Sequence, residues 1–286
     1  MSFPDWVDGI AYRSLSSSSK YGNCYLIASG STRILVDYGV PLRKMEGFLG
    51  EAGCDPKSIS AILMTHEHGD HSRGLHIKNP FHRRYGIEVY ATGGTWEGIS
   101  KPPDNLTHRL IRPGSLIDID GLEISAMPKL HDAREPIALL IRGNSSSLGI
   151  ATDLGEFTPE MADFLRGADH YIIESNYDPD LELASPRPRS LIARVMGPRG
   201  HLSNYQAAEA MSLLVTADTS SVLLAHLSLE CNRPALAIKT MTRALANTEF
   251  AGFVAAAPAG VPGEIMGDTA MRTSSETGNA TENFRL

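Results

Sequence analysis

One stretch of eight residues, Met-Thr-His-Glu-His-Gly-Asp-His at positions 64–71, constrains the fold more than any other. It follows the apolar run at 61–64, which predicts a buried strand, and a helix-like pattern begins at Ser72. A solvated polar loop is the alternative. Packing alone, however, gives no reason for three histidines and an aspartate at this spacing.

The residue types of this stretch indicate a metal site. Alternate residues at a strand end point to one side, so we expect His66 and His68 to face the same way. Gly69 then turns the chain and presents Asp70 and His71 together. Imidazole nitrogens and a carboxylate oxygen are donors that suit zinc or manganese.

The composition is that of an ordinary globular protein. The chain has 286 residues, of which 42% are hydrophobic and 21% charged. No run approaches the roughly 18 apolar residues of a membrane span, and the first residues lack the pattern of a secretory signal. The three cysteines, Cys24, Cys54 and Cys231, share no CxxC spacing, so we expect a reduced, cytoplasmic compartment. The net charge of -7 does not by itself indicate a nucleic-acid binder.

Periodicity and turn residues predict alternating strands and helices. We expect a single domain over residues 1–255 and a disordered tail over 256–286, where Ala, Gly, Pro, Thr and Ser dominate. Proline-capped and amphipathic segments predict helices at 41–53, 72–84, 159–166, 203–215 and 234–246, and another opening at Gly93. Strands are expected at 10–15, 23–29, 32–36, 88–92, 109–111, 115–119, 122–127, 137–142, 147–152, 171–174 and 221–225.

Acidic and imidazole groups follow several of these strands. They are Asp37, His66 with His68, His131, Asp153 and His226. In layered α/β folds, ligand groups converge at strand ends, so the joint placement is more informative than any one residue. Asp37 is open to two interpretations, a turn aspartate or an acceptor that orients a ligand histidine.

The pattern HxHxDH followed by distant His, Asp and His resembles the metallo-β-lactamase superfamily. That resemblance implies an α/β fold of the αββα four-layer sandwich type. It also implies two divalent cations, zinc before manganese. One would be bound by His66, His68, His131 and Asp153, and the other by Asp70, His71, Asp153 and His226.

The charge of such a centre favours a hydrolytic site. Two divalent cations against Asp70, Asp153 and a bridging hydroxide leave about +1, which matches a phosphodiester better than a neutral lactam or thioester. Two cations roughly 3.5–4 Å apart lower the pKa of water and stabilise an in-line displacement. The bridging hydroxide is the expected nucleophile, and Asp70 is counted with the catalytic residues.

Further motifs resemble one branch of the superfamily. The chain has Tyr-Gly-Asn-Cys at 21–24, His-Asp-Ala at 131–133, Thr-Asp-Leu-Gly at 152–155, Glu-Ser-Asn at 174–176, Gly-His-Leu-Ser-Asn at 200–204 and Ala-His-Leu-Ser-Leu-Glu-Cys-Asn at 225–232. Together these are similar to the YycJ (WalJ) family of 5′-to-3′ DNA exonucleases. The similarity runs from about residue 10 to 240. The chain departs from that family at Tyr177 and in a Pro/Arg-rich run between residues 181 and 200.

Candidate substrate groups lie outside the ligand set. His201 is the candidate proton donor, by similarity to a phosphodiesterase branch with a histidine in a His-x-x-Asn context, and Asn204 completes that context. The alternative for His201 is a helix cap. Ser17 belongs to a serine-rich loop that suits either phosphate binding or a hairpin turn. Arg187 and Arg189, with Arg194 and Arg199, suit a nucleic-acid backbone or a solvated loop.

Three functions are compatible with these residues. The first is a two-metal phosphodiesterase that acts on nucleic acid as a 5′-to-3′ exonuclease, with DNA expected as the substrate in preference to RNA. The second is a hydrolase of the same fold that opens small cyclic phosphates or processes RNA. The third is a non-catalytic scaffold, which usually requires damaged ligands, whereas all seven positions are filled here.

Overall fold

A computed structural model describes residues 3, 6–77, 79–99 and 108–268 of the chain. These residues fall into two compact units, each described by itself. The first unit holds the described residues up to 128, 133–146 and 258–268, and the second holds 129–132 and 147–257. The single domain over 1–255 remains a prediction, because compactness of two units does not show that either folds alone.

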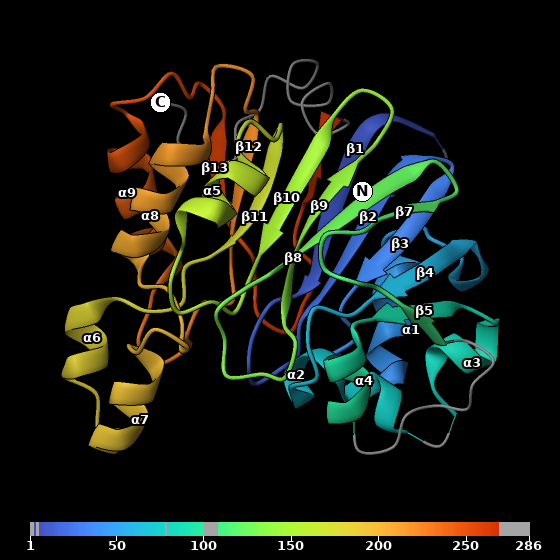
Figure 1. Ribbon diagram of the computed structural model, residues 1–286, viewed down its shortest axis with the longest axis horizontal. Helices are drawn as coiled ribbons and strands as arrows, with labels where there is room; N and C mark the ends of the chain where they lie inside the picture. The colour runs from blue at the N-terminus through green and yellow to red at the C-terminus, as the bar shows by residue number, and fades with distance from the viewer. Residues whose placement is uncertain (1–2, 4–5, 78, 100–107, 269–286) are drawn as a thin grey trace. The chain divides into compact units, whose positions relative to one another are not determined.

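The first unit contains a mixed sheet of seven strands in the order β14-β1-β2-β3-β4-β5-β6. Pairing is antiparallel from β14 to β3 and parallel from β3 to β6. Every residue of β2 and β3 is buried, as in strands covered on both faces. The strands are β1 (Val7–Ser16), β2 (Cys24–Gly30), β3 (Thr32–Val36), β4 (Ile59–Leu63), β5 (Glu88–Ala91), β6 (His108–Leu110) and β14 (Ile265–Gly267) (Figure 1).

A helix and an antiparallel ribbon complete the first unit. Helix α1 (Leu42–Glu51) buries Met45, Phe48 and Leu49 in the same apolar core as β1 to β5. The ribbon consists of β7 (Leu116–Ile119), β8 (Leu122–Pro128) and β9 (Ile137–Arg142). Asp120 and Gly121 form its first turn, with φ of 50° and 88°, as the predicted hairpin requires.

The segment after the histidine-rich stretch differs from the predicted helix at 72–84. It consists of α2 (Gly69–Ser72), the 3-10 turn η2 (Arg73–His76) and α3 (Phe81–Tyr85). Pro80 has no N–H to donate and disfavours helical backbone in the residue before it, so the helix stops and restarts. Another short turn, η1 (Pro56–Ser58), precedes β4, and α4 (Gly93–Gly98) begins where predicted.

The second unit is built on four parallel strands and their helices. The strands are β10 (Ser147–Ala151), β11 (His170–Glu174), β12 (Ser221–Ala225) and β13 (Phe253–Ala256). Between them run α5 (Pro159–Leu165), α8 (Asn204–Leu214) and α9 (Pro234–Leu245), close to their predicted bounds. Ser203 and Gln206 form a capping box at α8.

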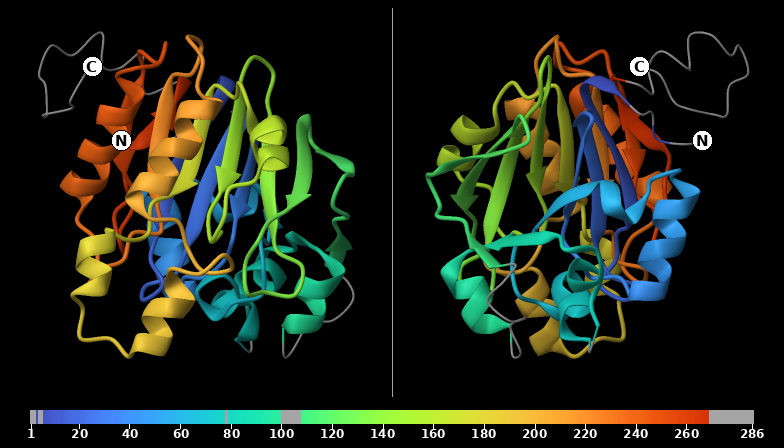
Figure 2. Two further views of the ribbon diagram at one scale, coloured as in Figure 1. Left: turned by 60° about the vertical axis from the view of Figure 1, so that its left-hand side comes forward. Right: turned by 90° about the vertical axis from the view of Figure 1, so that its right-hand side faces the viewer.

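Two short helices lie in the Pro/Arg run, where we predicted none. They are α6 (Pro179–Leu183) and α7 (Arg189–Val195), drawn in yellow below α8 in Figures 1 and 2. Each begins beside a proline, which fixes the backbone angle that the first helical turn needs. Leu181, Leu191 and Met196 pack around Tyr177, Val195 and Cys231 in a small core of their own.

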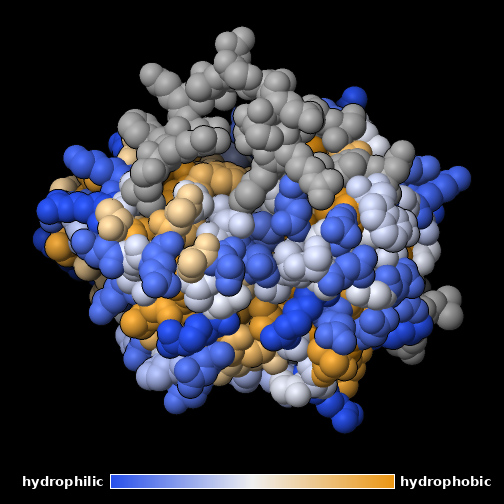
Figure 3. All heavy atoms as spheres, turned by 90° about the horizontal axis from the view of Figure 1, so that it is seen from above, coloured by the Kyte–Doolittle hydropathy of each residue, from blue (hydrophilic) through white to orange (hydrophobic). Residues whose placement is uncertain are grey.

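The chain is a mixed α/β protein with two sheets and helices, as predicted. None of the described helices has the length and apolar character needed to cross a bilayer. On the face viewed from above in Figure 3, apolar groups are interspersed among hydrophilic ones, which is ordinary for a protein surface.

The predicted disordered tail begins too early. Strand β14 pairs with β1, with Ala11 opposite Gly267 and Arg13 opposite Ile265. This segment has little periodicity, and its strand exists because β1 offers an unpaired edge. Residues 269–286 of the predicted tail lie outside the described residues.

Substitution of Met266 tests whether the β14 segment is folded. Its side chain is 4% exposed in β14, so Met266→Ala should lower the free energy of unfolding by about 2–5 kcal/mol. Urea denaturation of metal-free protein measures the change. The control, Val261→Ala, alters a residue that is 54% exposed and should stay within about 0.5 kcal/mol of the parent. Equal stability of the two variants would restore the original tail boundary.

Candidate metal centre

Three candidate residues share an unusual backbone conformation at strand ends. Asp37 and His226 directly follow β3 and β12, and Asp153 lies two residues after the end of β10. Their φ angles are 62°, 56° and 54° respectively. Asp120 in the β7–β8 hairpin is the only other non-glycine residue with positive φ among those described. Such angles are uncommon and cost on the order of 1–3 kcal/mol, so they persist mainly where the surroundings impose them, often at functional sites.

The histidines of the first unit gather as the sequence predicts. The ring of His66 lies 4.7 Å from that of His68 and 4.2 Å from that of His71, between ring centroids. His66 and His71 are buried, whereas His68 is partly exposed. The stretch at 64–71 therefore brings three imidazoles into one cluster.

Asp37 acts as an acceptor for this cluster. Its Oδ2 lies 2.6 Å from Nδ1 of His71, and its Oδ1 accepts the backbone N–H of Thr65 at 2.8 Å. The Thr65 hydroxyl also donates to Asp37, and it lies 3.0 Å from Nδ1 of His66. Of the two interpretations of Asp37, this geometry supports the one that orients a ligand histidine.

Asn23 is a site residue that the sequence reasoning missed. Its Nδ2 lies 3.2 Å from Oδ2 of Asp70 and 2.9 Å from Nε2 of His71, so the amide contacts both candidate ligands. Gly39 allows this close packing, because a side chain there would come within 1.6 Å of the Asp70 carbonyl oxygen. Position 23 lies in the Tyr-Gly-Asn-Cys motif, which was the available signal.

The serine-rich loop is a turn that supports Asn23. The backbone N–H of Ser18 donates to Oδ1 of Asn23 at 2.9 Å. Ser17 is buried, and its hydroxyl hydrogen-bonds that of Tyr25 at 2.8 Å. This placement supports the hairpin-turn alternative for Ser17.

His131 in the second unit is held by backbone. Its Nδ1 donates to the carbonyl oxygen of Gly200 at 3.1 Å. Burial, aided by the charges of Lys129 and His201, lowers the pKa of His131 to about 4, although Asp153 opposes the shift. The ring is therefore neutral at pH 7, the form that binds a metal.

Glu174, the last residue of β11, is the second residue that the sequence reasoning missed. Its buried Oε1 accepts from Nδ1 of His201 at 2.8 Å and from Nδ1 of His226 at 3.0 Å. Its Oε2 accepts the backbone N–H groups of Leu154 at 3.1 Å and Leu202 at 3.0 Å. The sequence places Glu174 both in the Glu-Ser-Asn motif and at the end of the predicted strand 171–174, and this strand-end position was the available signal.

The environment keeps Glu174 ionised. Burial alone would raise the pKa of Glu174, but the charge and hydrogen bond of His201 and the hydrogen bond of His226 outweigh it and lower the pKa to about 2. A carboxylate with four N–H donors orients its neighbours and has little capacity left to bind a metal.

Asp153 lies beside these groups. Its Oδ1 is 3.2 Å from Nδ1 of His226 and 3.9 Å from Nδ1 of His201. Asp153, Glu174, His201 and His226 each offer a donor atom, and these atoms all lie within 4.8 Å of one another. Because Glu174 is taken up by N–H donors, Asp153 is the carboxylate of this group that suits a metal.

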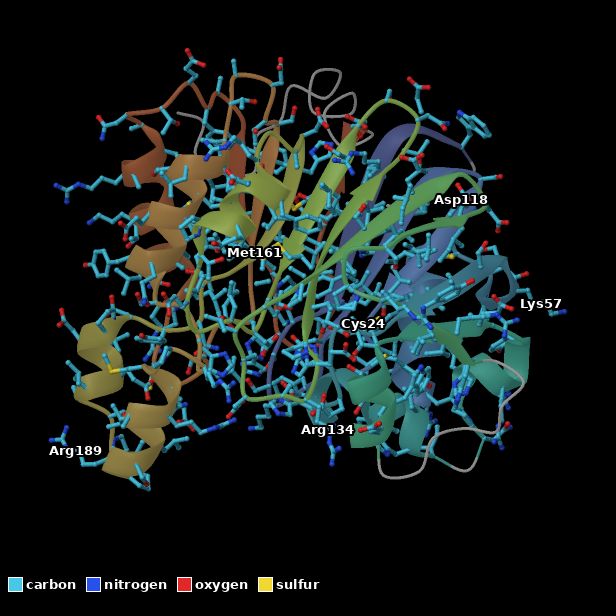
Figure 4. All side chains as sticks on the ribbon, viewed as in Figure 1. Cys24, Lys57, Asp118, Arg134, Met161 and Arg189 are labelled. Carbon is cyan, nitrogen blue, oxygen red and sulfur yellow. The ribbon has the colours of Figure 1, made fainter. Side chains whose placement is uncertain are left out.

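Two predicted substrate contacts have structural roles instead. Asn204 is buried, and its Oδ1 accepts from the Ser175 hydroxyl at 2.6 Å and from Nδ2 of Asn232 at 2.8 Å. The Arg187 guanidinium binds Glu182 at 3.0 Å and Glu230 at 2.9 Å. Both side chains are thus engaged by other residues of the second unit, and Arg187 stays 19% exposed. Arg189, in contrast, is exposed (Figure 4).

The donor set fits divalent cations. In His66, His71, His131 and His226, Nδ1 is engaged by Thr65, Asp37, Gly200 and Glu174 respectively. A proton on Nδ1 leaves the lone pair on Nε2, and this is how metal-binding histidines are usually oriented. In His71 this Nε2 lies 2.9 Å from the Asn23 amide nitrogen. Nitrogen donors combined with the oxygens of Asp70 and Asp153 suit zinc and also admit manganese.

Comparisons with known proteins agree with this chemistry. A family model described as the β-lactamase superfamily domain matches residues 32–227. Exodeoxyribonuclease YycJ of Bacillus anthracis is 30% identical, over 85% of this chain and 91% of the relative. Exodeoxyribonuclease WalJ of Streptococcus pneumoniae is 31% identical, over 85% of this chain and 90% of the relative.

Solved structures show the fold. The metallo-β-lactamase fold protein YhfI from Bacillus subtilis superposes with a TM-score of 0.67 at 19% identity, covering 91% of this chain and 99% of YhfI. A diphosphatase of the PhnP family gives 0.61 at 16% identity, covering 89% of this chain and 97% of the other. The predicted metallo-β-lactamase fold is thereby confirmed.

Acid titration tests the role of Glu174. The pKa of Glu174 in the folded protein, about 2, lies below the ordinary value of roughly 4.3. The ionised carboxylate therefore stabilises the fold above about pH 4.3. This contribution to stability is lost as the pH falls toward 2. Glu174→Gln should therefore be less stable at neutral pH and lose less stability over that acid range. Denaturation of chelator-treated protein from pH 6 to 2 measures both effects. The exposed Glu209→Gln is the control, and identical pH profiles for the two variants would contradict the assignment.

Proposed function

Because the chain belongs to the β-lactamase superfamily, and within it to the family of the YycJ and WalJ exodeoxyribonucleases, it is a metal-dependent hydrolase, and we propose that it hydrolyses phosphodiester links at the end of a DNA strand. The observation that carries the proposal is the Glu174 carboxylate, which holds a candidate metal ligand, His226, and a candidate proton donor, His201.

We propose that the site binds a pair of divalent cations, with zinc preferred to manganese. His66, His68, His131 and Asp153 would bind one, and Asp70, His71, Asp153 and His226 the other. The orientation of the histidines through Nδ1 supports this set. When bound, such a pair lowers the pKa of water and stabilises the oxygens of an in-line displacement.

His201 would supply the proton to the leaving oxygen. Glu174 accepts a hydrogen bond from its Nδ1 and so orients the ring, and Nε2 is then the atom that donates. The side chain is 14% exposed, which lets a substrate reach it. Ser203 caps α8, which speaks against the alternative that His201 serves as the cap.

The polarity and substrate rest on the family. The named relatives are exodeoxyribonucleases, so we propose removal of nucleotides from DNA. The 5′-to-3′ direction that we propose is the one implied by the family resemblance of the sequence motifs. A phosphodiester link carries one negative charge, which matches the residual charge of about +1 at a two-metal site with two carboxylates and a hydroxide. We also propose a cytoplasmic location, since Cys24, Cys54 and Cys231 are all buried and unpaired.

The direct test combines metal analysis with digestion. Purified protein should hold two divalent metals per chain and release mononucleotides from 5′-phosphorylated DNA, both single-stranded and duplex. RNA of the same sequence and a small cyclic phosphate serve as competing substrates. Faster turnover of either competitor would replace the DNA assignment, and a two-metal sample inert to every phosphodiester would indicate a scaffold.

His68 and His201 form a matched pair of variants. His68→Ala should lose metal and activity together, because it removes a ligand. His201→Ala should retain both metals and slow kcat by about 10²–10⁴-fold, because it removes a proton donor. Metal content by mass spectrometry and single-turnover digestion separate the two. Loss of metal from His201→Ala would make His201 a ligand instead.

Asp37 tests the orientation of His71. Asp37→Asn removes the charge that holds Nδ1 of His71, and it should weaken metal affinity by about 10–100-fold. Competition with a chromogenic chelator measures the affinity. The control is Asp163→Asn on the exposed face of α5, which should leave affinity unchanged. An unchanged affinity in Asp37→Asn would mean that Asp37 is only a turn residue.

A further inference from the structure

The α6–α7 segment, residues 179–200, is the basic part of an acidic chain. It contains four arginines, Arg187, Arg189, Arg194 and Arg199, against two acids, Asp180 and Glu182. The whole chain has a formal charge of -7. Glu230 and Asp132, acids outside the segment, offset part of this positive charge, so any surface for a polyanion depends on the arginines that remain exposed.

The four arginines are not equivalent. Arg187 is 19% exposed and lies between Glu182 and Glu230, so its charge is neutralised. Arg194 binds Asp132 at 2.6 Å while half of its side chain stays exposed. Arg189 and Arg199 are exposed, and neither guanidinium has an ion-pair partner among residues 108–268. Figure 4 shows Arg189 pointing outward from the segment.

The segment is fixed to the loops that carry site residues. Arg187 contacts Ser228 at 3.3 Å and Glu230, both in the loop that follows His226. At the other end, the carbonyl oxygen of Arg199 accepts the N–H of Asp132, the neighbour of His131. These contacts place the exposed cations at a defined position relative to His131, His201 and His226.

The spacing of the exposed cations suits a strand. Arg199 lies two residues before His201, so their Cα atoms are within about 7 Å. Helix α7 begins at Arg189 and rises about 1.5 Å per residue, which adds about 10 Å between the two arginines. Successive phosphates of one strand advance by about 3.4 Å along a duplex axis and lie farther apart through space, so this span covers more than one phosphate.

We propose that the α6–α7 segment binds the backbone of the strand being digested, with Arg189 and Arg199 contacting phosphates beyond the one that is hydrolysed. This rests on the proposed function and deepens it, because it makes a nucleic-acid chain the preferred substrate over a single ester or a cyclic phosphate. Phosphate contacts position a strand without reading its bases, as an exonuclease requires.

Charge reversal of the two exposed arginines tests the proposal. The double variant Arg189→Glu/Arg199→Glu is compared with the parent on two substrates. One is a single-stranded oligonucleotide of about 20 nucleotides, and the other is the p-nitrophenyl ester of thymidine 5′-monophosphate, which has no further phosphates.

We expect KM for the oligonucleotide to rise by about tenfold or more, and the salt dependence of log KM to fall by about 0.7 per lost contact. We expect kcat/KM for the ester to stay within about twofold of the parent, since the segment does not touch the reacting link.

Matched variants keep the result specific. Arg243→Glu alters an exposed arginine on α9 of the same unit and should change none of these constants. Arg189→Gln/Arg199→Gln should give a smaller rise in KM, because it removes the cations without adding repulsion. Thermal melting checks that each variant folds like the parent.

Two further measurements separate this inference from the proposed function. Equal KM and salt dependence in parent and double variant would overturn the α6–α7 proposal while leaving the exonuclease intact. If the parent releases no nucleotides, anisotropy of a labelled oligonucleotide decides the matter. Binding that is lost in the double variant would support the segment as a nucleic-acid surface and reject the exonuclease. Absence of binding by the parent would reject both.

Discussion

The second unit depends on one buried carboxylate. Glu174 ends β11 and accepts N–H groups from His201, His226, Leu154 and Leu202. A buried charge is costly unless it is paired and hydrogen-bonded, and here every donor comes from a chain segment near a candidate site residue. The same carboxylate therefore sets the position of the β10 and β12 loops and of the chain before α8.

This arrangement joins a candidate proton donor, His201, and a candidate metal ligand, His226, through one group. His226 and His201 present Nδ1 to the same oxygen of Glu174, so the two rings are oriented together. The corresponding device in the first unit is Asp37, which binds His71 and Thr65. In both units, therefore, a buried carboxylate binds Nδ1 of a histidine and leaves Nε2 as the nitrogen that can contact a metal or a substrate.

The Pro/Arg run shows how charge is divided between structure and surface. Arg187 joins α6 to the loop after His226 through Glu182 and Glu230, and Arg194 joins α7 to the loop of His131 through Asp132. Only Arg189 and Arg199 leave their charge without a partner among the residues described on α6, α7 and their loops. Sequence composition alone does not distinguish the four arginines. Arg187 and Arg194 differ from the other two because they pair with acids that lie 5 to 62 positions away in the sequence.

The sequence by itself determined the side chains able to bind a metal and the strands they follow. The spacing of the histidines at 66, 68 and 71 and the apolar runs before them are local properties, which the sequence displays without any knowledge of tertiary contacts. Only the tertiary structure decided which groups hold those side chains. Asn23, Glu174 and the carbonyl of Gly200 act across 27 to 69 positions, and β14 pairs with a strand at the other end of the chain. Hydrogen bonds of such separation depend on how strands and loops pack, which no periodicity in the sequence records.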